Sequence, residues 1–191
     1  MITKIDEKTA LVLIDLQKGI AKDTVHPVAD VIRNAVKLID AFRKRSLPVV
    51  LVTVNPSGAR FLKCRIEGGK SISPTGEMAL PEDFADLVPE IEPLASDIQI
   101  RKRTWNAFFE TDLHEQLQKH GVTGIVLGGI STSIGVEGTA RAASEFGYNQ
   151  TFVVDAMSDK ILEAHDCTVN YIFPRLGELG TTAEVIQHLE L

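Results

Sequence analysis

Short, continuous apolar runs recur along the chain, and segments with helical periodicity separate them. Polar or turn-forming residues flank each run, which is typical of strands buried on both faces of a sheet. The predicted strands are "ALVLID" at 10–15, "PVVLVTVN" at 48–55, "DIQIRK" at 97–102, "TGIVLGG" at 123–129 and "QTFVVDA" at 150–156, with a last short strand around "GTT" at 180–182.

The segments between these runs carry apolar residues three and four positions apart, as on one face of a helix. The pattern is clearest from Pro27 to Arg45, where the proline suits a first helical turn. Further helices are predicted at 112–121, 132–147, 163–176 and 183–191. Alternating strands and helices with short connections indicate one doubly wound α/β domain over residues 1–191, with a parallel sheet and helices on both faces.

Composition and charge argue against several classes of protein. The net charge of −6 disfavours nucleic-acid binding, which depends on Lys and Arg neutralising phosphates. The chain has no apolar stretch of eighteen residues and begins with charged residues, so we expect no membrane span, no signal peptide and a cytoplasmic location. The two cysteines, Cys64 and Cys167, lack C-x-x-C spacing and are expected to be reduced thiols.

Polar residues stand where the predicted strands end, and ligands of doubly wound sheets bind at the carboxyl ends of the strands. The candidates are Asp15, Gln17, Asn55, Lys102, Asp155 and the corner at 129–135. An Asp beside a Lys in one cleft would suit proton transfer, because the ammonium orients the carboxylate and the pocket tunes it. An acid at a strand end is also a common cap or turn residue, and a Lys there is commonly solvated.

The corner itself contains two glycines, Gly135 and Gly138, in the first turns of a predicted helix. Each is less favourable there than alanine by roughly 0.5 to 1 kcal/mol. Two explanations remain open: the glycines allow another element to pack closely, or they make room for a ligand against free N–H groups of the helix.

Other chemistries fit the same stretch less well. Residues 129–133 read "GISTS" and lack the second glycine of a G-x-S-x-G nucleophile elbow, although Ser131, Asp155 and His165 follow the chain order of an α/β-hydrolase triad. No phosphate-binding glycine motif follows a strand, and the histidines have no metal-ligand spacing. We therefore expect no metal and no nucleotide cofactor.

Several motifs, in their order and spacing, resemble the isochorismatase-like (cysteine hydrolase) superfamily across nearly the whole chain. They are "ALVLIDLQ", "KRTWNAF", "GGISTSIGVEGTARAASEFGY", "VVDAMSD" and "IFPRLGELGTTAEVI". The resemblance implies a largely parallel six-stranded sheet, a site at the strand ends and a homodimer or homotetramer.

The resemblance also implies roles for single residues. Asp15 is the proton-transfer group, Lys102 supports it, and Gly135 takes the place of the cysteine nucleophile that most members carry. Without a thiol, no covalent acyl intermediate can form at that position. The peptide between Ile130 and Ser131 is expected to be cis, with Ile130, Ser131 and Thr132 lining the substrate pocket.

The leading hypothesis is a cofactor-independent hydrolase of a small molecule, and isochorismate, a vinyl ether, is the suggested substrate. Trp105 and Phe108 could wall the pocket, Gln17 and Asn55 could bind polar substrate groups, and Arg60 could meet a carboxylate. Core packing for the aromatic residues and turn roles for the polar ones are the competing explanations. Two functional alternatives stay open: hydrolysis of an amide or ester by activated water, and a catalytically inactive binding or oligomeric protein.

Overall fold

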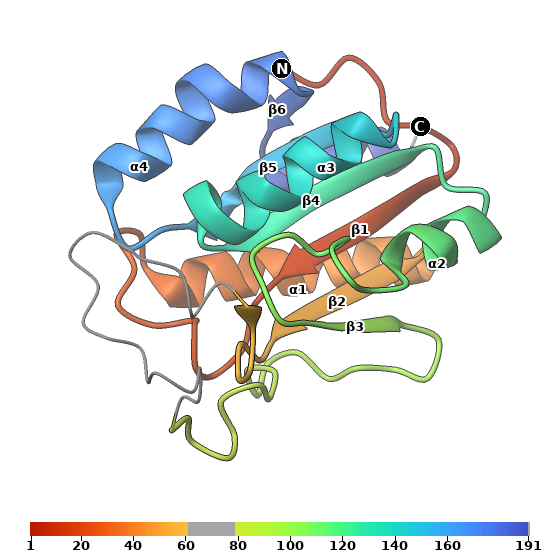
Figure 1. The fold of residues 1–191 in the computed structure, drawn as a ribbon. Coiled ribbons are helices and arrows are strands. Elements are labelled where there is room, and N and C mark those ends of the chain that lie inside the picture. The colour runs from red at the N-terminus through yellow and green to blue at the C-terminus, as the bar shows by residue number, and fades with distance from the viewer. Residues whose placement is uncertain (61–78, 191) are drawn as a thin grey trace.

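The computed structural model describes residues 1–60 and 79–190, and within them the chain forms one six-stranded parallel sheet (Figure 1). The order across the sheet is β3-β2-β1-β4-β5-β6. The strands are β1 (Thr9–Ile14), β2 (Val49–Val54), β3 (Ile98–Lys102), β4 (Gly124–Ile130), β5 (Asn149–Ser158) and β6 (Glu178–Gly180). The predicted doubly wound α/β fold is confirmed, with strand bounds close to the apolar runs.

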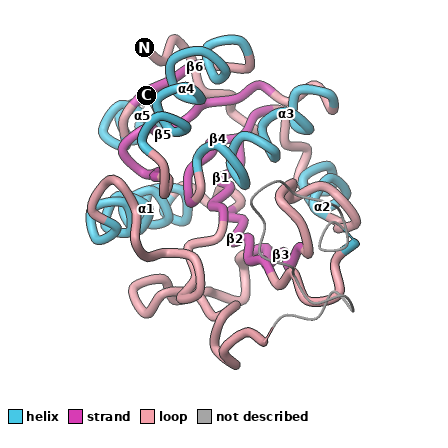
Figure 2. Tube along the Cα trace, turned by 60° about the vertical axis from the view of Figure 1, so that its left-hand side comes forward, coloured by secondary structure: helices cyan, strands magenta, loops and turns pink. Residues whose placement is uncertain are grey.

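Helices cover both faces of the sheet, as the view along its edge in Figure 2 shows. One face is covered by α1 and α5, and the other by α2 and α3. The helices are α1 (Val28–Lys44), α2 (Leu113–Lys119), α3 (Glu137–Glu145), α4 (Leu162–Cys167) and α5 (Thr182–Glu190). No helix within the described ranges is long and apolar enough to cross a membrane.

Alternation along the strands divides the core into two layers, because successive side chains point to opposite faces. In β1, Ala10, Val12 and Ile14 pack under α2 and α3, whereas Leu11 and Leu13 pack under α1 and α5. All six residues of β1 are buried. The continuous apolar run in the sequence therefore reflects a central strand that helices cover on both faces of the sheet.

Two predicted helices are wrong in part. The helix expected over 132–147 begins with a π-helical turn, Thr132–Val136, because the Ser131 carbonyl accepts N–H groups from both Ile134 and Val136. The helix expected over 163–176 gives way after α4 to a π turn and then to a 3-10 turn, Phe173–Arg175, which contains Pro174. Proline has no N–H to donate, so it cannot continue the preceding helix and suits the first turn of the 3-10 segment.

The order of the strands opens a crevice between β1 and β4. The chain leaves β1 for β2 on one side and later enters β4 on the other, and ligands of doubly wound sheets bind at such a switch point. Ile14 and Gly129 are paired in this register. Gly129 has a φ of 120°, and a side chain there would clash with the Ile14 carbonyl oxygen, so only glycine fits this close approach.

Candidate active site

Asp15 and Lys102 meet at the carboxyl ends of β1 and β3. Lys102 Nζ lies 2.9 Å from Asp15 Oδ2, although β2 separates the two strands. Neighbouring strands are spaced by roughly 4.8 Å, so only a long side chain can cross the end of β2 and reach the acid. The resemblance implies that Lys102 supports Asp15, and the fold brings the two side chains together.

Both members of this pair are buried, with 5% of Asp15 and 1% of Lys102 exposed. Burial raises the pKa of Asp15 to about 6, and the attraction of the Lys102 ammonium opposes that rise without cancelling it. Lys102 Nζ also donates to the Trp105 carbonyl oxygen at 2.6 Å. The ammonium is therefore held by two acceptors, one charged and one from the backbone.

The second carboxylate oxygen of Asp15, Oδ1, is buried and has no hydrogen-bond partner among residues 1–60 and 79–190. Most buried side-chain oxygens in proteins have one, so each exception calls for an explanation. Asp15 itself has a left-handed backbone with φ at 52°, a region that Asp adopts more readily than most residues. The acid thus places one oxygen on Lys102, while its other oxygen stays buried without a partner in the described part of the chain.

Gly135 is the third group at this point. A Cβ added to it would lie 3.2 Å from Lys102 Nζ, 3.3 Å from Asp15 Oδ2 and 2.8 Å from Ile14 Cγ2. The missing side chain of residue 135 thus points directly at the charged pair. Carboxylate, ammonium and glycine corner, which lie far apart in the sequence, converge on one spot.

The corner before Gly135 is shaped by its backbone. The Ile130–Ser131 peptide is cis, as the resemblance implied. Ile130 is buried in the core, while the Thr132 hydroxyl bonds His165 Nδ1 at 2.9 Å. The side chains of Ile130 and Thr132 are therefore occupied away from the Asp15–Lys102 pair, and what the corner can offer a ligand is its backbone and partly exposed Ser131.

Gln17 and Asn55 bind neighbouring backbone. The Gln17 amide donates to the carbonyl oxygens of Val54 and Phe84 and accepts the Val54 N–H, so it ties the end of β2 to residues that follow the undescribed segment. The Asn55 side chain accepts the N–H of Ser57, which is a turn interaction. Both residues stand beside the site in structural roles.

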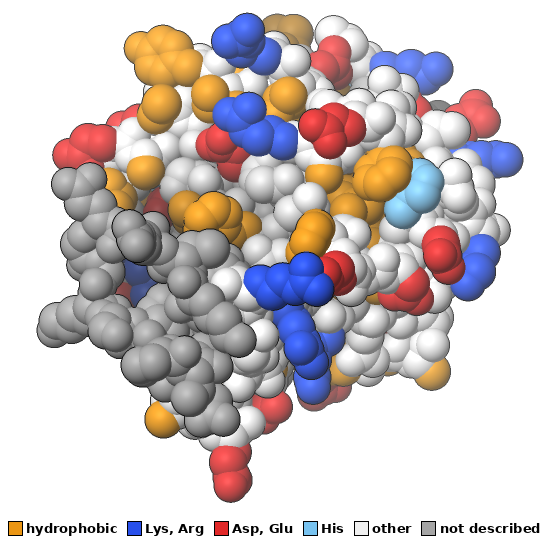
Figure 3. Space-filling view, in the orientation of Figure 1, with side chains coloured by type: hydrophobic (Ala, Val, Ile, Leu, Met, Phe, Trp, Pro, Cys, Tyr) orange, Lys and Arg blue, Asp and Glu red, His pale blue; other side chains and the backbone are white. Residues whose placement is uncertain are grey.

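Trp105 and Phe108 differ in exposure. Phe108 is buried and packs against Phe146 and Tyr148, away from Asp15. Trp105 is 53% exposed and lines a groove of about 830 Å³. Figure 3 shows apolar and basic side chains side by side on this face. The groove is lined by Gly58, Ala59, Arg60, Arg101, Arg103, Thr104, Trp105, Asn106, Phe109, Glu110 and Gly138.

The serine triad does not assemble within the described residues. Asp155 accepts hydrogen bonds from the N–H and the hydroxyl of Thr182, and so caps α5. His165 bonds Thr132 instead of Ser131. The chain order of a triad is present, but the hydrogen bonds that a triad needs are made to other residues.

Sequence reasoning missed Thr139. This threonine of α3 is fully buried, accepts the N–H of Ala107 and donates to the carbonyl oxygen of Gly135. Its signal in the sequence is weak: a hydroxyl four residues after Gly135, on a helix face otherwise made of apolar and small residues.

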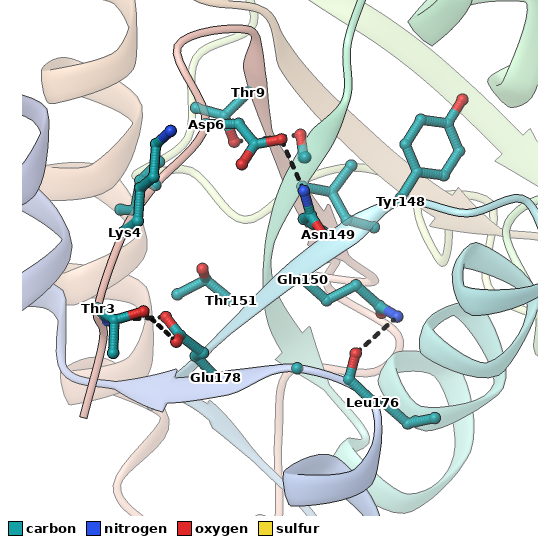
Figure 4. Close-up of a pocket in the computed structure, with 14 residues that line it drawn as sticks. Thr3, Lys4, Asp6, Thr9, Tyr148, Asn149, Gln150, Thr151, Leu176 and Glu178 are labelled. Atoms are coloured by element: carbon teal, nitrogen blue, oxygen red, sulfur yellow. Dashed lines mark hydrogen bonds between the residues drawn. The ribbon is translucent and has the colours of Figure 1, made fainter.

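A second cavity, of about 310 Å³, lies at the amino ends of the strands, at the opposite end of the sheet from Asp15 (Figure 4). Its polar side chains bond one another or the backbone: Asn149 donates to Asp6, Thr3 to Glu178, and Gln150 to the Leu176 carbonyl oxygen. No group of three or more metal-ligating side chains occurs among residues 1–60 and 79–190. The buried charged pair at the carboxyl ends is therefore the better candidate for chemistry.

The profile of the isochorismatase domain matches residues 9–184, a span that contains Asp15, Lys102 and the glycine corner. The chain belongs to the isochorismatase family, whose members are hydrolases. The uncharacterized isochorismatase family protein YwoC of Bacillus subtilis is 45% identical over 189 residues, covering 96% of this chain and 95% of the relative. Nicotinamidase 3 of Arabidopsis thaliana is 27% identical over 165 residues, covering 84% of this chain and 78% of the relative.

Among solved structures, an isochorismatase family protein from Burkholderia thailandensis has the same fold. It superposes with a TM-score of 0.89 at 36% sequence identity, and the match covers 100% of both chains. The isochorismatase-family architecture therefore extends over the whole described structure.

Proposed function

We propose that this isochorismatase-family hydrolase cleaves the vinyl ether of isochorismate, or of a closely related enol ether, without a cofactor or a covalent intermediate. The observation that carries the proposal is the buried Asp15–Lys102 pair facing a residue without a side chain, Gly135. In the family resemblance Gly135 takes the position of the cysteine nucleophile. A vinyl ether needs a proton and a water molecule, and neither requires a nucleophilic side chain.

The mechanism follows from the chemistry of the pair. Asp15 donates its proton to the methylene carbon of the enol ether, which leaves an oxocarbenium ion at the neighbouring carbon. Lys102 stabilises the carboxylate that forms. Water adds to the oxocarbenium carbon and returns a proton to Asp15, and the resulting hemiketal collapses to pyruvate and a dihydrodiol. A pKa of about 6 suits this role, because an acid works best when its pKa is near the working pH.

The test is the release of pyruvate from isochorismate, measured by a coupled lactate dehydrogenase assay. We expect turnover by the native chain and its loss, by about 100-fold or more, in Asp15→Asn, since a positioned acid contributes roughly 10²–10⁴-fold. Asp83→Asn is the matched control, because Asp83 is an exposed acid paired with Lys18 and should leave turnover unchanged. Absence of pyruvate at every enzyme concentration rules isochorismate out as the substrate.

A second candidate is hydrolysis of an amide or ester by water that Asp15 activates as a base. The unpaired Asp15 Oδ1 favours it, because a carboxylate oxygen without a donor can accept a proton from water. Nicotinamidase 3 bears the name of an amide-cleaving enzyme. The two reactions differ in how their rate depends on pH. If Asp15 acts as a base, the enzyme is active above the pKa of Asp15, and if it acts as an acid, the enzyme is active below that pKa. If the chain is instead a ligand-binding protein without catalytic activity, the native chain shows no turnover, and Asp15→Asn therefore causes no change in rate.

Association of copies of this chain belongs to the same proposal. Exposed apolar side chains lie on neighbouring segments beside the corner: Ile134 on the π turn and Ile161 and Leu162 at the start of α4, which packs against that turn. Large exposed apolar groups near one another are typical of protein interfaces. A homodimer or homotetramer would cover them.

A further inference from the structure

The hydroxyl of Thr139 makes two hydrogen bonds that have different origins. It donates to the Gly135 carbonyl oxygen at 2.7 Å, four residues earlier, which is a common bond of threonine within helices. It also accepts the N–H of Ala107 at 3.1 Å, and Ala107 lies 32 residues away in the loop after β3. Helical geometry explains the first bond but not the second.

The two partners of Thr139 belong to the two sides of the candidate site. Ala107 stands two residues after Trp105, whose carbonyl oxygen accepts a hydrogen bond from Lys102. Gly135 lies on the opposite side, where a Cβ added to it would be 3.2 Å from Lys102 Nζ. Hydrogen bonds therefore link Lys102 to the Trp105 carbonyl and, two residues further along the loop, link Ala107 through Thr139 to Gly135.

Next to this bond, the loop and the start of α3 leave room for a methyl group at Gly138. A Cβ added to Gly138, the residue before Thr139, would have its nearest neighbour, Trp105 Cβ, at 3.7 Å. Farther along, Phe108 meets Phe146, the residue at the C-terminal cap of α3. The loop is thus held to the far end of α3 by aromatic contact and to its near end by the fully buried Thr139 hydroxyl.

We propose that Thr139 is a positioning residue, which fixes the Trp105 carbonyl and hence the Lys102 ammonium relative to Asp15 and Gly135. Its consequence for turnover rests on the proposed function, but its consequence for the charged pair does not. When the Ala107 N–H loses its acceptor, the loop moves, the Trp105 carbonyl no longer holds Lys102, and the ammonium leaves its place beside Asp15.

Thr139→Val tests this, because valine keeps the shape of threonine and lacks the hydroxyl. We expect the pKa of Asp15, followed by ¹³C NMR of its carboxyl group, to rise by about half a unit or more, since the nearby ammonium lowers it. We expect kcat to fall about tenfold with KM changed less than about twofold, because misplacement by a fraction of an ångström affects the reacting geometry. Thr139→Ser keeps the hydroxyl and should restore both values.

Thr9→Val is the matched control. Thr9 is also buried and its hydroxyl donates to the Gly124 carbonyl oxygen, but it stands at the amino end of β1, away from Asp15. It should lower the unfolding temperature as Thr139→Val does and leave the Asp15 titration unchanged. Thr139→Ala gives the same comparison if the valine variant does not fold.

An Asp15 titration that is unchanged in Thr139→Val and Thr139→Ala overturns the inference, and so does an equal shift in Thr9→Val. These outcomes are separable from the fate of the proposed function. If the native chain releases no pyruvate, the NMR titration still decides the role of Thr139. If the native chain turns over and Thr139→Val keeps both its kcat and its titration, the function stands and the inference fails.

Discussion

Asp15 is governed by two opposing effects, burial and a neighbouring positive charge. Removal from water favours the neutral acid, and Lys102 at 2.9 Å favours the carboxylate. Burial is the larger of the two, so the pKa comes out at about 6 instead of below the usual value of 3.8. An acid of this kind carries its proton over a part of the pH range in which surface carboxylates have lost theirs.

The pH dependence of turnover follows from that value. If Asp15 acts as the acid, kcat/KM is level below about pH 6 and falls about tenfold per pH unit above it, because only the protonated form reacts. Initial rates across pH 4.5–8.5 (about four units) measure this. A limb that rises through the same pKa would contradict acid catalysis and identify Asp15 as a base.

The same group should be visible in the unfolding free energy. Its folded pKa lies above its unfolded value, so the native state binds the extra proton, and stability is lost as pH rises from about 4 to about 6. The loss amounts to about 3 kcal/mol, at 1.36 kcal/mol per unit. The measurement is the difference between the native chain and Asp15→Asn in urea unfolding at each pH, since asparagine does not titrate and other groups cancel. If the difference in unfolding free energy does not change with pH, the pKa of Asp15 is not raised in the folded chain.

At the scale of elements, the corner between β4 and α3 does most to form the site. It combines the close approach of Gly129 to the backbone of β1 with a π-helical turn, and a Cβ added to residue 135 would point at the charged pair beyond the ends of β1 and β3. π turns in proteins often occur at functional sites. The two helix glycines, which periodicity alone could not explain, differ in this setting.

Alanine substitution separates the two glycines. Gly135→Ala forces a Cβ to within 2.8 Å of Ile14 Cγ2 and toward Lys102, so we expect a loss of about 1–3 kcal/mol in stability and a lower kcat. Gly138→Ala meets nothing closer than 3.7 Å and should gain about 0.5–1 kcal/mol, as alanine does in helices. Urea unfolding of both variants checks this. If Gly135→Ala and Gly138→Ala change the unfolding free energy equally, the space at residue 135 is not restricted by its neighbours at the Asp15–Lys102 pair.

Sequence reasoning reached the strands and the strand-end residues because both depend on local patterns. Continuous apolar runs specify buried strands, and Asp15 and Lys102 were found as polar residues that end them. Sequence reasoning failed where the local structure or the role of a residue depends on specific hydrogen bonds that the sequence does not reveal. The π turn depends on a carbonyl shared by two N–H groups, and Thr139 matters only because the fold brings Ala107 to it. Asp155 looked equivalent to Asp15 in the sequence, yet it caps a helix.

At the scale of the whole molecule, the two ends of the sheet have different characters. The carboxyl ends hold a buried ion pair with an unpaired oxygen, whereas carboxylates at the amino ends, Asp6 and Glu178, accept bonds from neighbouring side chains. Those bonds lower the pKa of Glu178 below its ordinary value. One end is thus suited to proton transfer and the other to holding the N-terminal segment in place.

Association of copies can be tested at this scale. We expect light scattering to give two or four times the mass of one chain, as the resemblance implied, and Leu162→Glu combined with Ile161→Glu to give the monomer. Both residues are exposed in the single chain, so the charges cost little before association. A native chain that stays monomeric at all concentrations would contradict the proposed assembly.

The two crowded glycines of the corner also leave different paths open to evolution. At Gly129 a new side chain meets the main chain of β1, which cannot yield without opening the sheet. At Gly135 the nearest obstacle is a methyl group of Ile14, and smaller residues at position 14 would remove it. Two substitutions, a smaller residue at position 14 and a cysteine at position 135, would therefore place a thiol beside this lysine and aspartate without a change in the main chain of β1.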